Sequence, residues 1–213
     1  MTILDIGDLN DEQRRRLTLV ASGAGGTFFF LLVSGALAGS QALIADGLDF
    51  AALAVALGLG LALKDAPAAL RAGARLVGNV VLALTGLAVG LATLHGFVAR
   101  VAPEPTLMGA AALVALAANG TTLYLLRDER EGGALRNLWF TARTDLAGSA
   151  AVLIAAGVVA LVGNAVPDLT VAGVIVVLFF VMLVPELRGA MAQWESQRTG
   201  AASPTPPGDP EAH

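Results

Sequence analysis

Long apolar blocks separated by short polar connections dominate the chain. Each block can form a helix of about 20 residues, the length that crosses the roughly 30 Å hydrocarbon layer of a bilayer. The blocks are too long for the strands of a membrane β-barrel, and they lack the alternation of apolar and polar residues that such strands show. We therefore predict an all-α polytopic membrane protein with six transmembrane helices, at about residues 17–39, 41–64, 73–100, 107–127, 138–163 and 168–188.

The composition agrees with this fold class and narrows the function. Of 213 residues, 56% are hydrophobic and only 14% are charged, which is typical of membrane proteins. The chain has no cysteine, which excludes disulfides, thiolate metal ligands and cysteine catalysis. The sequence has no basic patch of the kind that binds nucleic acid, so we expect no nucleic-acid partner. The polar, acidic start of the chain does not resemble a cleaved signal peptide, so we expect the first helix to be retained.

The sequence divides into three parts. Residues 1–16 form a predicted cytoplasmic N-terminal arm, and residues 17–188 form the six-helix transmembrane domain. Residues 189–213 become rich in proline, serine, threonine and alanine, and we predict a disordered cytoplasmic tail there.

The basic residues orient the bundle. Lysine and arginine are enriched in the cytoplasmic connections of membrane proteins. In the predicted topology only Arg100 lies on one side of the membrane. The other side carries Arg14, Arg15, Arg16, Lys64, Arg71, Arg75, Arg127, Arg130, Arg136, Arg188 and Arg198. We therefore expect both termini in the cytoplasm, and we expect the bacterial inner (plasma) membrane as the location.

Three carboxylates lie within the apolar blocks. Asp46 and Asp49 are three residues apart and share one face of the second predicted helix, while Asp145 lies in the fifth. A charged side chain at the centre of a membrane helix costs roughly 2.5–3.5 kcal/mol on insertion scales, so such residues usually serve a function. The functional interpretation is a cation or proton site at mid-membrane. The structural alternative is that they pair with Arg143, bond to serine or threonine, or stay protonated.

Polar residues on the neighbouring helices leave a similar choice. Thr141 and Asp145 belong to one polar stripe of the fifth predicted helix. Asn119 on the fourth predicted helix either lines a pathway or forms a hydrogen bond between helices, which is the commoner role of such residues.

Several runs resemble the cation diffusion facilitator family. GSQALIADGLDF is similar to the family's second helix, with Gly39-Ser40 at its start, Asp46 in its Ala-Asp pair and Asp49 at its first ligand position. TARTDLAGS aligns Asp145 with the second ligand position of the family's fifth helix. PDLTVAGVIV and ANGTTLYLLR resemble the start of its sixth helix and the end of its fourth.

The resemblance implies a six-helix exporter of divalent cations, usually a homodimer, that exchanges zinc or a similar metal for protons. The sequence departs from the family pattern at two ligand positions, where Leu53 replaces aspartate and Thr141 replaces histidine or aspartate. The family's cytoplasmic metal-binding domain has no counterpart in the roughly 25 residues after the sixth predicted helix.

We therefore predict a divalent-cation transporter, coupled to protons, with Asp49, Asp145, Asp46 and Thr141 at the metal site. Oxygen donors suit hard cations better than they suit zinc, which favours nitrogen and sulfur. Zinc, manganese, iron and cobalt are the candidate ions. The alternative is a degenerate relative that no longer transports and serves as a membrane scaffold or partner subunit. We predict no enzyme activity, catalytic residue or cofactor, because the membrane segments contain no His–carboxylate or Ser–His constellation.

Overall fold

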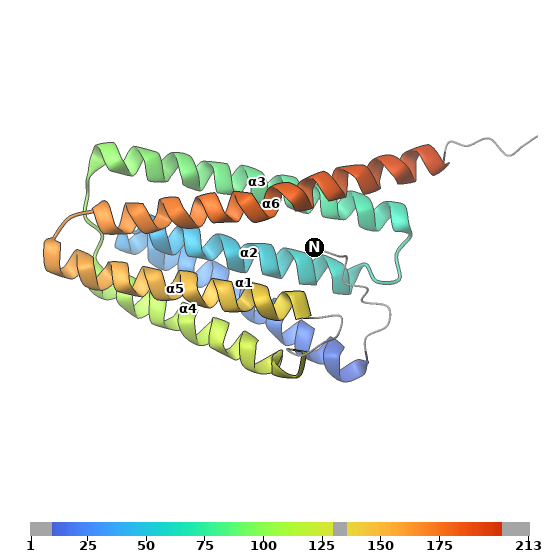
Figure 1. Cartoon of the computed structure of the whole chain (residues 1–213), viewed down its shortest axis with the longest axis horizontal. Helices are drawn as coiled ribbons and strands as arrows, with labels where there is room; N and C mark the ends of the chain where they lie inside the picture. Colours follow the sequence, from blue (N-terminus) through green and yellow to red (C-terminus); the bar gives the residue numbers. More distant parts are fainter. Residues whose placement is uncertain (1–9, 130–135, 202–213) are drawn as a thin grey trace, which may run out of the picture.

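The computed structural model describes residues 10–129 and 136–201, and every regular element in these two ranges is helical (Figure 1). Six of the helices are long and apolar enough to cross a membrane, which confirms the predicted fold class. They are α1 (Asp11–Ala38), α2 (Gln41–Ala62), α3 (Ala68–Ala99), α4 (Pro105–Leu125), α5 (Arg136–Val162) and α6 (Val166–Ala201). A short 3-10 turn, η2 (Arg127–Glu129), follows α4.

The first helix begins earlier than its apolar block. Asn10 caps α1: its side chain accepts a hydrogen bond from the Gln13 backbone N–H, and the Gln13 side chain accepts one from the Asn10 N–H. This reciprocal capping box satisfies two backbone donors that a helix start leaves free. Part of the predicted N-terminal arm is therefore helical, while residues 1–9 lie outside the described residues.

The sixth helix corrects the prediction of a disordered tail after residue 188. α6 continues to Ala201, so residues 189–201 are helical, and residues 202–213 lie outside the described part of the chain. Hydropathy marks where an apolar block ends, whereas a helix continues while its residues favour it and find packing partners. Trp194 supplies such a partner, since its ring lies 3.0 Å from the position that a Cβ atom on Gly73 of α3 would occupy.

Helices that are consecutive in the chain run antiparallel, and α2 lies at the centre of the bundle (Figure 1). α1 packs most extensively on α2, α3 on α6, and α4 on α5, while α2 touches all five other helices. α3 and α6 lie on one side of α2, and α1, α4 and α5 lie on the other (Figure 1). Of the six membrane-length helices, α2 has the largest buried share, so its polar residues are the best shielded from lipid.

Buried hydrogen bonds join the helices at the end of the bundle that holds the α1–α2 turn. Asp168, at the start of α6, is 1% exposed and accepts hydrogen bonds from Ser40 Oγ at 2.6 Å and from the backbone N–H groups of Gln41 and Ala42 at 2.9 and 3.2 Å. The backbone N–H of Glu104 also donates to the Ala38 carbonyl at 2.8 Å. The turn is thereby tied both to α6 and to the α3–α4 connection.

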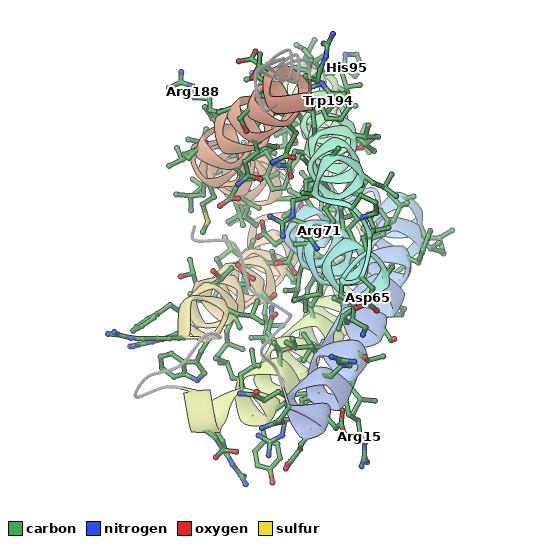
Figure 2. The ribbon with its side chains drawn as sticks, turned by 90° about the vertical axis from the view of Figure 1, so that its right-hand side faces the viewer. Arg15, Asp65, Arg71, His95, Arg188 and Trp194 are labelled. Carbon is green, nitrogen blue, oxygen red and sulfur yellow. The ribbon has the colours of Figure 1, made fainter. Side chains whose placement is uncertain are left out.

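The opposite end of the bundle is basic. Arg15, Arg71 and Arg188 lie around this end, which faces the viewer in Figure 2. Arg16 of α1 donates to Asp128 of η2 at 2.6 Å, and its guanidinium holds the pKa of that carboxyl below its usual value. We refer to this end, which carries the basic residues of the α1 start and the α2–α3 and α4–α5 connections, as the basic end.

Candidate cation-binding site

Asp46 is completely buried between three helices. It lies on α2 with an exposed fraction of 0%, and Ser149 of α5 places its Oγ 3.0 Å from Asp46 Oδ1 and 2.9 Å from Oδ2. Asn119 of α4 donates from Nδ2 to the same Ser149 Oγ at 3.0 Å. The insertion cost of this carboxylate is therefore offset by a hydrogen bond from another helix.

The contact between Asp46 and Ser149 sets how α2 and α5 lie along each other. The two helices run antiparallel, so moving toward the basic end raises the residue number on α2 and lowers it on α5 (Figure 1). Asp49 is three residues beyond Asp46, and Asp145 is four residues before Ser149, which is one helical turn in the same direction on both helices. The register therefore brings Asp49 and Asp145 to the same height along the axis of the bundle.

The electrostatics and the burial agree with this register. Asp49 lies within electrostatic range of both Asp145 and Asp46. Asp145 is 8% exposed, and Asp49 is partly buried. Two carboxylates that face each other in a shielded interior repel when both are ionised, and a cation or a proton between them removes that repulsion.

One turn further toward the basic end, the same register pairs Leu53 with Thr141. Leu53 is buried at 8% exposure, whereas Thr141 is partly buried. On α2, the buried Leu53 therefore follows Asp49 on the side of the basic end. On α5, the hydroxyl of Thr141 lies one turn from Asp145. This placement is consistent with Thr141 as an additional oxygen donor.

The carboxylates do not form a compact cluster. Within the described residues, no group of three or more histidine, cysteine, aspartate or glutamate side chains is placed to hold a metal ion. The arrangement therefore offers Asp49 and Asp145 as a carboxylate pair, with Asp46 one turn away and held by Ser149. Two carboxylates supplemented by hydroxyl, carbonyl and water oxygens match the ligand preferences of hard divalent cations.

Arg143 forms no ion pair with Asp145. Its side chain is exposed, and among the ion pairs of the described residues none joins it to Asp145. Asp145 is therefore not neutralised by the arginine two residues before it. Asn119 bonds between helices, as the commoner role of such residues predicts.

Two polar residues of the interior received no role from the sequence. Ser149 lies four residues after Asp145, on the same face of α5, and this spacing was the signal that could have found it. Asp168 follows a proline at the start of an apolar block, where an acidic residue is common for helix-dipole reasons. Its bonds to the start of α2 join residues more than 120 positions apart, and no local pattern predicts them.

The cation efflux transmembrane domain matches residues 69–193, more than half of the chain. The chain belongs to the cation efflux family. The match runs from α3 to α6 and includes Thr141, Asp145 and Ser149. Asp46 and Asp49 on α2 precede the matched region, so their assignment rests on the register described above and on the sequence resemblance. A search of curated proteins found no match. Membership in the cation efflux family, together with six membrane-length helices, identifies the chain as an integral membrane protein of a transporter family.

Proposed function

We propose that the protein exports a divalent cation across the membrane in exchange for protons, with Asp49 and Asp145 as the residues that bind the cation. Thr141 supplies a further oxygen donor, and Asp46 assists from one turn away. The observation that carries this proposal is the register of α2 and α5, which brings two shielded carboxylates from different helices to one level of the bundle.

The chemistry of the site favours a hard or borderline cation. Carboxylate, hydroxyl, carbonyl and water oxygens suit manganese and iron(II) better than zinc, which prefers nitrogen and sulfur ligands. Among the candidates zinc, manganese, iron and cobalt, manganese is therefore the first ion to test. Cation binding to carboxylates that carry protons releases those protons, and this competition is the simplest basis for cation/proton antiport.

The orientation and assembly belong to the same proposal. The concentration of arginine at the basic end supports its placement on the cytoplasmic side, with both termini in the cytoplasm and the protein in a bacterial inner membrane. We further propose a homodimer, as the family resemblance implies.

The test is cation-driven proton flux in proteoliposomes. Purified protein is reconstituted with a pH-sensitive dye inside the vesicles, and a Mn²⁺ gradient is applied with and without an opposing pH gradient. Asp49→Asn and Asp145→Asn each remove one ionisable ligand but keep the side-chain size. We expect both variants to reduce Mn²⁺-dependent flux to the level of empty vesicles.

A matched control removes a carboxylate outside the membrane interior. Asp65 lies in the α2–α3 connection with its side chain 82% exposed, in an ion pair with Lys64. Asp65→Asn should transport at the wild-type rate. Wild-type flux in either Asp49→Asn or Asp145→Asn contradicts the assigned site, and absence of both flux and calorimetric cation binding in the wild-type protein contradicts the function.

A further inference from the structure

A chain of three buried polar residues links α4, α5 and α2. Asn119, Ser149 and Asp46 have exposed fractions of 1%, 0% and 0%, and they are joined in sequence by hydrogen bonds of 2.9–3.0 Å. Burying polar groups at these positions is costly unless each finds a partner. The hydrogen bonds among these three residues offset this cost, and they join three different helices at one point of the interior.

The direction of the hydrogen bonds follows from donor inventories. The Asn119 Nδ2 group only donates, so Ser149 Oγ accepts there. The single hydroxyl proton of Ser149 is then free to point at Asp46, whose two oxygens lie at 3.0 and 2.9 Å. Asn119 orients Ser149, and Ser149 orients Asp46.

The position of Ser149 between both Asp46 oxygens limits what else that carboxylate can do. A cation that bound Asp46 through both oxygens would have to displace the Ser149 hydroxyl and leave Asn119 without its acceptor. The side of Asp46 that faces α5 is therefore already occupied by a protein hydrogen bond.

The same contact fixes the axial register of α2 against α5. Asp46 and Ser149 each lie one turn from the proposed ligand on their own helix, which is Asp49 on α2 and Asp145 on α5. Sliding one helix by a single turn, roughly 5.4 Å, would break the hydrogen bond and move the two ligands out of level.

We propose that Asn119, Ser149 and Asp46 are positioning residues, and that their hydrogen-bond chain holds Asp49 opposite Asp145 while Asp46 itself does not bind the cation. This inference deepens the proposed function and rests on it for its effect on transport. Partners that orient metal ligands from behind typically affect metal affinity or activity by about 10- to 100-fold when they are removed.

Cross-linking tests the positioning without any transport. The natural chain has no cysteine, so Asp49→Cys combined with Asp145→Cys introduces the only two thiols. We expect a short bifunctional methanethiosulfonate reagent to cross-link the two cysteines when the rest of the sequence is wild type. When Ser149→Ala is added to the double-cysteine protein, we expect the cross-link to be lost. No cross-link in the unchanged background, or an equal yield after Ser149→Ala, overturns the inference.

A control separates this effect from the mere loss of a buried hydroxyl. Thr93 of α3 is 2% exposed, and its hydroxyl donates to the Val89 carbonyl of its own helix. Thr93→Val removes a buried hydroxyl that takes no part in the hydrogen bonds among Asn119, Ser149 and Asp46, so the cross-link should persist. Ser149→Thr keeps the donor and should restore the cross-link that Ser149→Ala loses.

Transport kinetics then distinguish a positioning residue from a ligand. Asp46→Asn and Ser149→Ala should each raise the KM for Mn²⁺ by about 10- to 100-fold. The KM of the double variant should be no higher than that of the more impaired single variant. A further loss in the double variant means that Asp46 binds the cation itself, which overturns the inference. An unchanged KM in Ser149→Ala with only a lower unfolding temperature also overturns it. Failure of wild-type transport refutes the proposed function alone, because the cross-linking result stands apart from it.

Discussion

Asp168→Ala should strongly destabilise the bundle by disconnecting α6 from the start of α2. The substitution removes the acceptor of the Ser40 hydroxyl and of the backbone N–H groups of Gln41 and Ala42. The bonds from Ser40 and Ala42 are buried, and a buried donor that loses its partner costs about 1–3 kcal/mol. The two together predict a loss of about 2–6 kcal/mol, and the partly buried Gln41 N–H adds little because it can bond to water instead.

Related variants should show a graded response. Asp168→Asn keeps one acceptor oxygen and should lose less stability than Asp168→Ala. Ser40→Ala leaves Asp168 with its two backbone donors but removes the cap that accepts from the Leu43 N–H, so we expect a loss of about 1–2 kcal/mol. Asp65→Ala, at an exposed carboxylate, should unfold like the wild type.

The measurement is reversible unfolding in mixed micelles as the fraction of sodium dodecyl sulfate rises. Tryptophan fluorescence reports the transition, because Trp194 packs against α3 in the folded state. Circular dichroism follows the helices in parallel. The reasoning is refuted if Asp168→Ala unfolds at the wild-type detergent fraction, or if Ser40→Ala is the more damaging change.

Two further predictions concern packing and pH. Gly35→Ala should cost about 1–3 kcal/mol, since a Cβ there would lie 2.7 Å from Ile44 Cγ1 and 3.2 Å from the Ile44 backbone nitrogen, whereas Gly23→Ala, with open space around it, should be neutral or stabilising in the same unfolding assay. Equal effects of the two changes would contradict the close approach of α1 and α2. Glu104 caps α4, and the backbone N–H groups of Leu107 and Thr106 hold its pKa below the ordinary value of 4.5. Because its folded pKa is depressed, Glu104 stabilises the fold above pH 4.5 and loses this contribution as the pH falls through the folded value. Glu104→Gln should therefore flatten the acid side of the curve of stability against pH. An unchanged curve would exclude the Glu104 cap as the source of the acid-side loss of stability.

The number and approximate positions of the helices follow from hydropathy alone. A membrane helix must satisfy its backbone internally and present an apolar surface over the full bilayer, so its signal is continuous and local. The ends of the helices were less predictable. Asn10 starts α1 before its apolar block, and the packing of Trp194 against α3 accompanies the continuation of α6 past residue 188.

The candidate residues were also visible in the sequence, because an aspartate in an apolar block is conspicuous whatever its partner. The resemblance separated Asp49, at a ligand position, from Asp46 in the Ala-Asp pair before it, but the sequence could not show what Asp46 contacts. The difference depends on α5, which places Ser149 against Asp46 and brings Asp145 to the level of Asp49.

The sequence by itself thus determined which side chains are too polar for their surroundings, since that depends only on each residue and its neighbours in the chain. The tertiary structure alone decided which of those side chains meet. Asp46 meets Ser149 and Asn119, and Asp168 meets the start of α2. Such pairings depend on the axial register of helices that are far apart in the sequence, and register is set by the packing of the whole bundle.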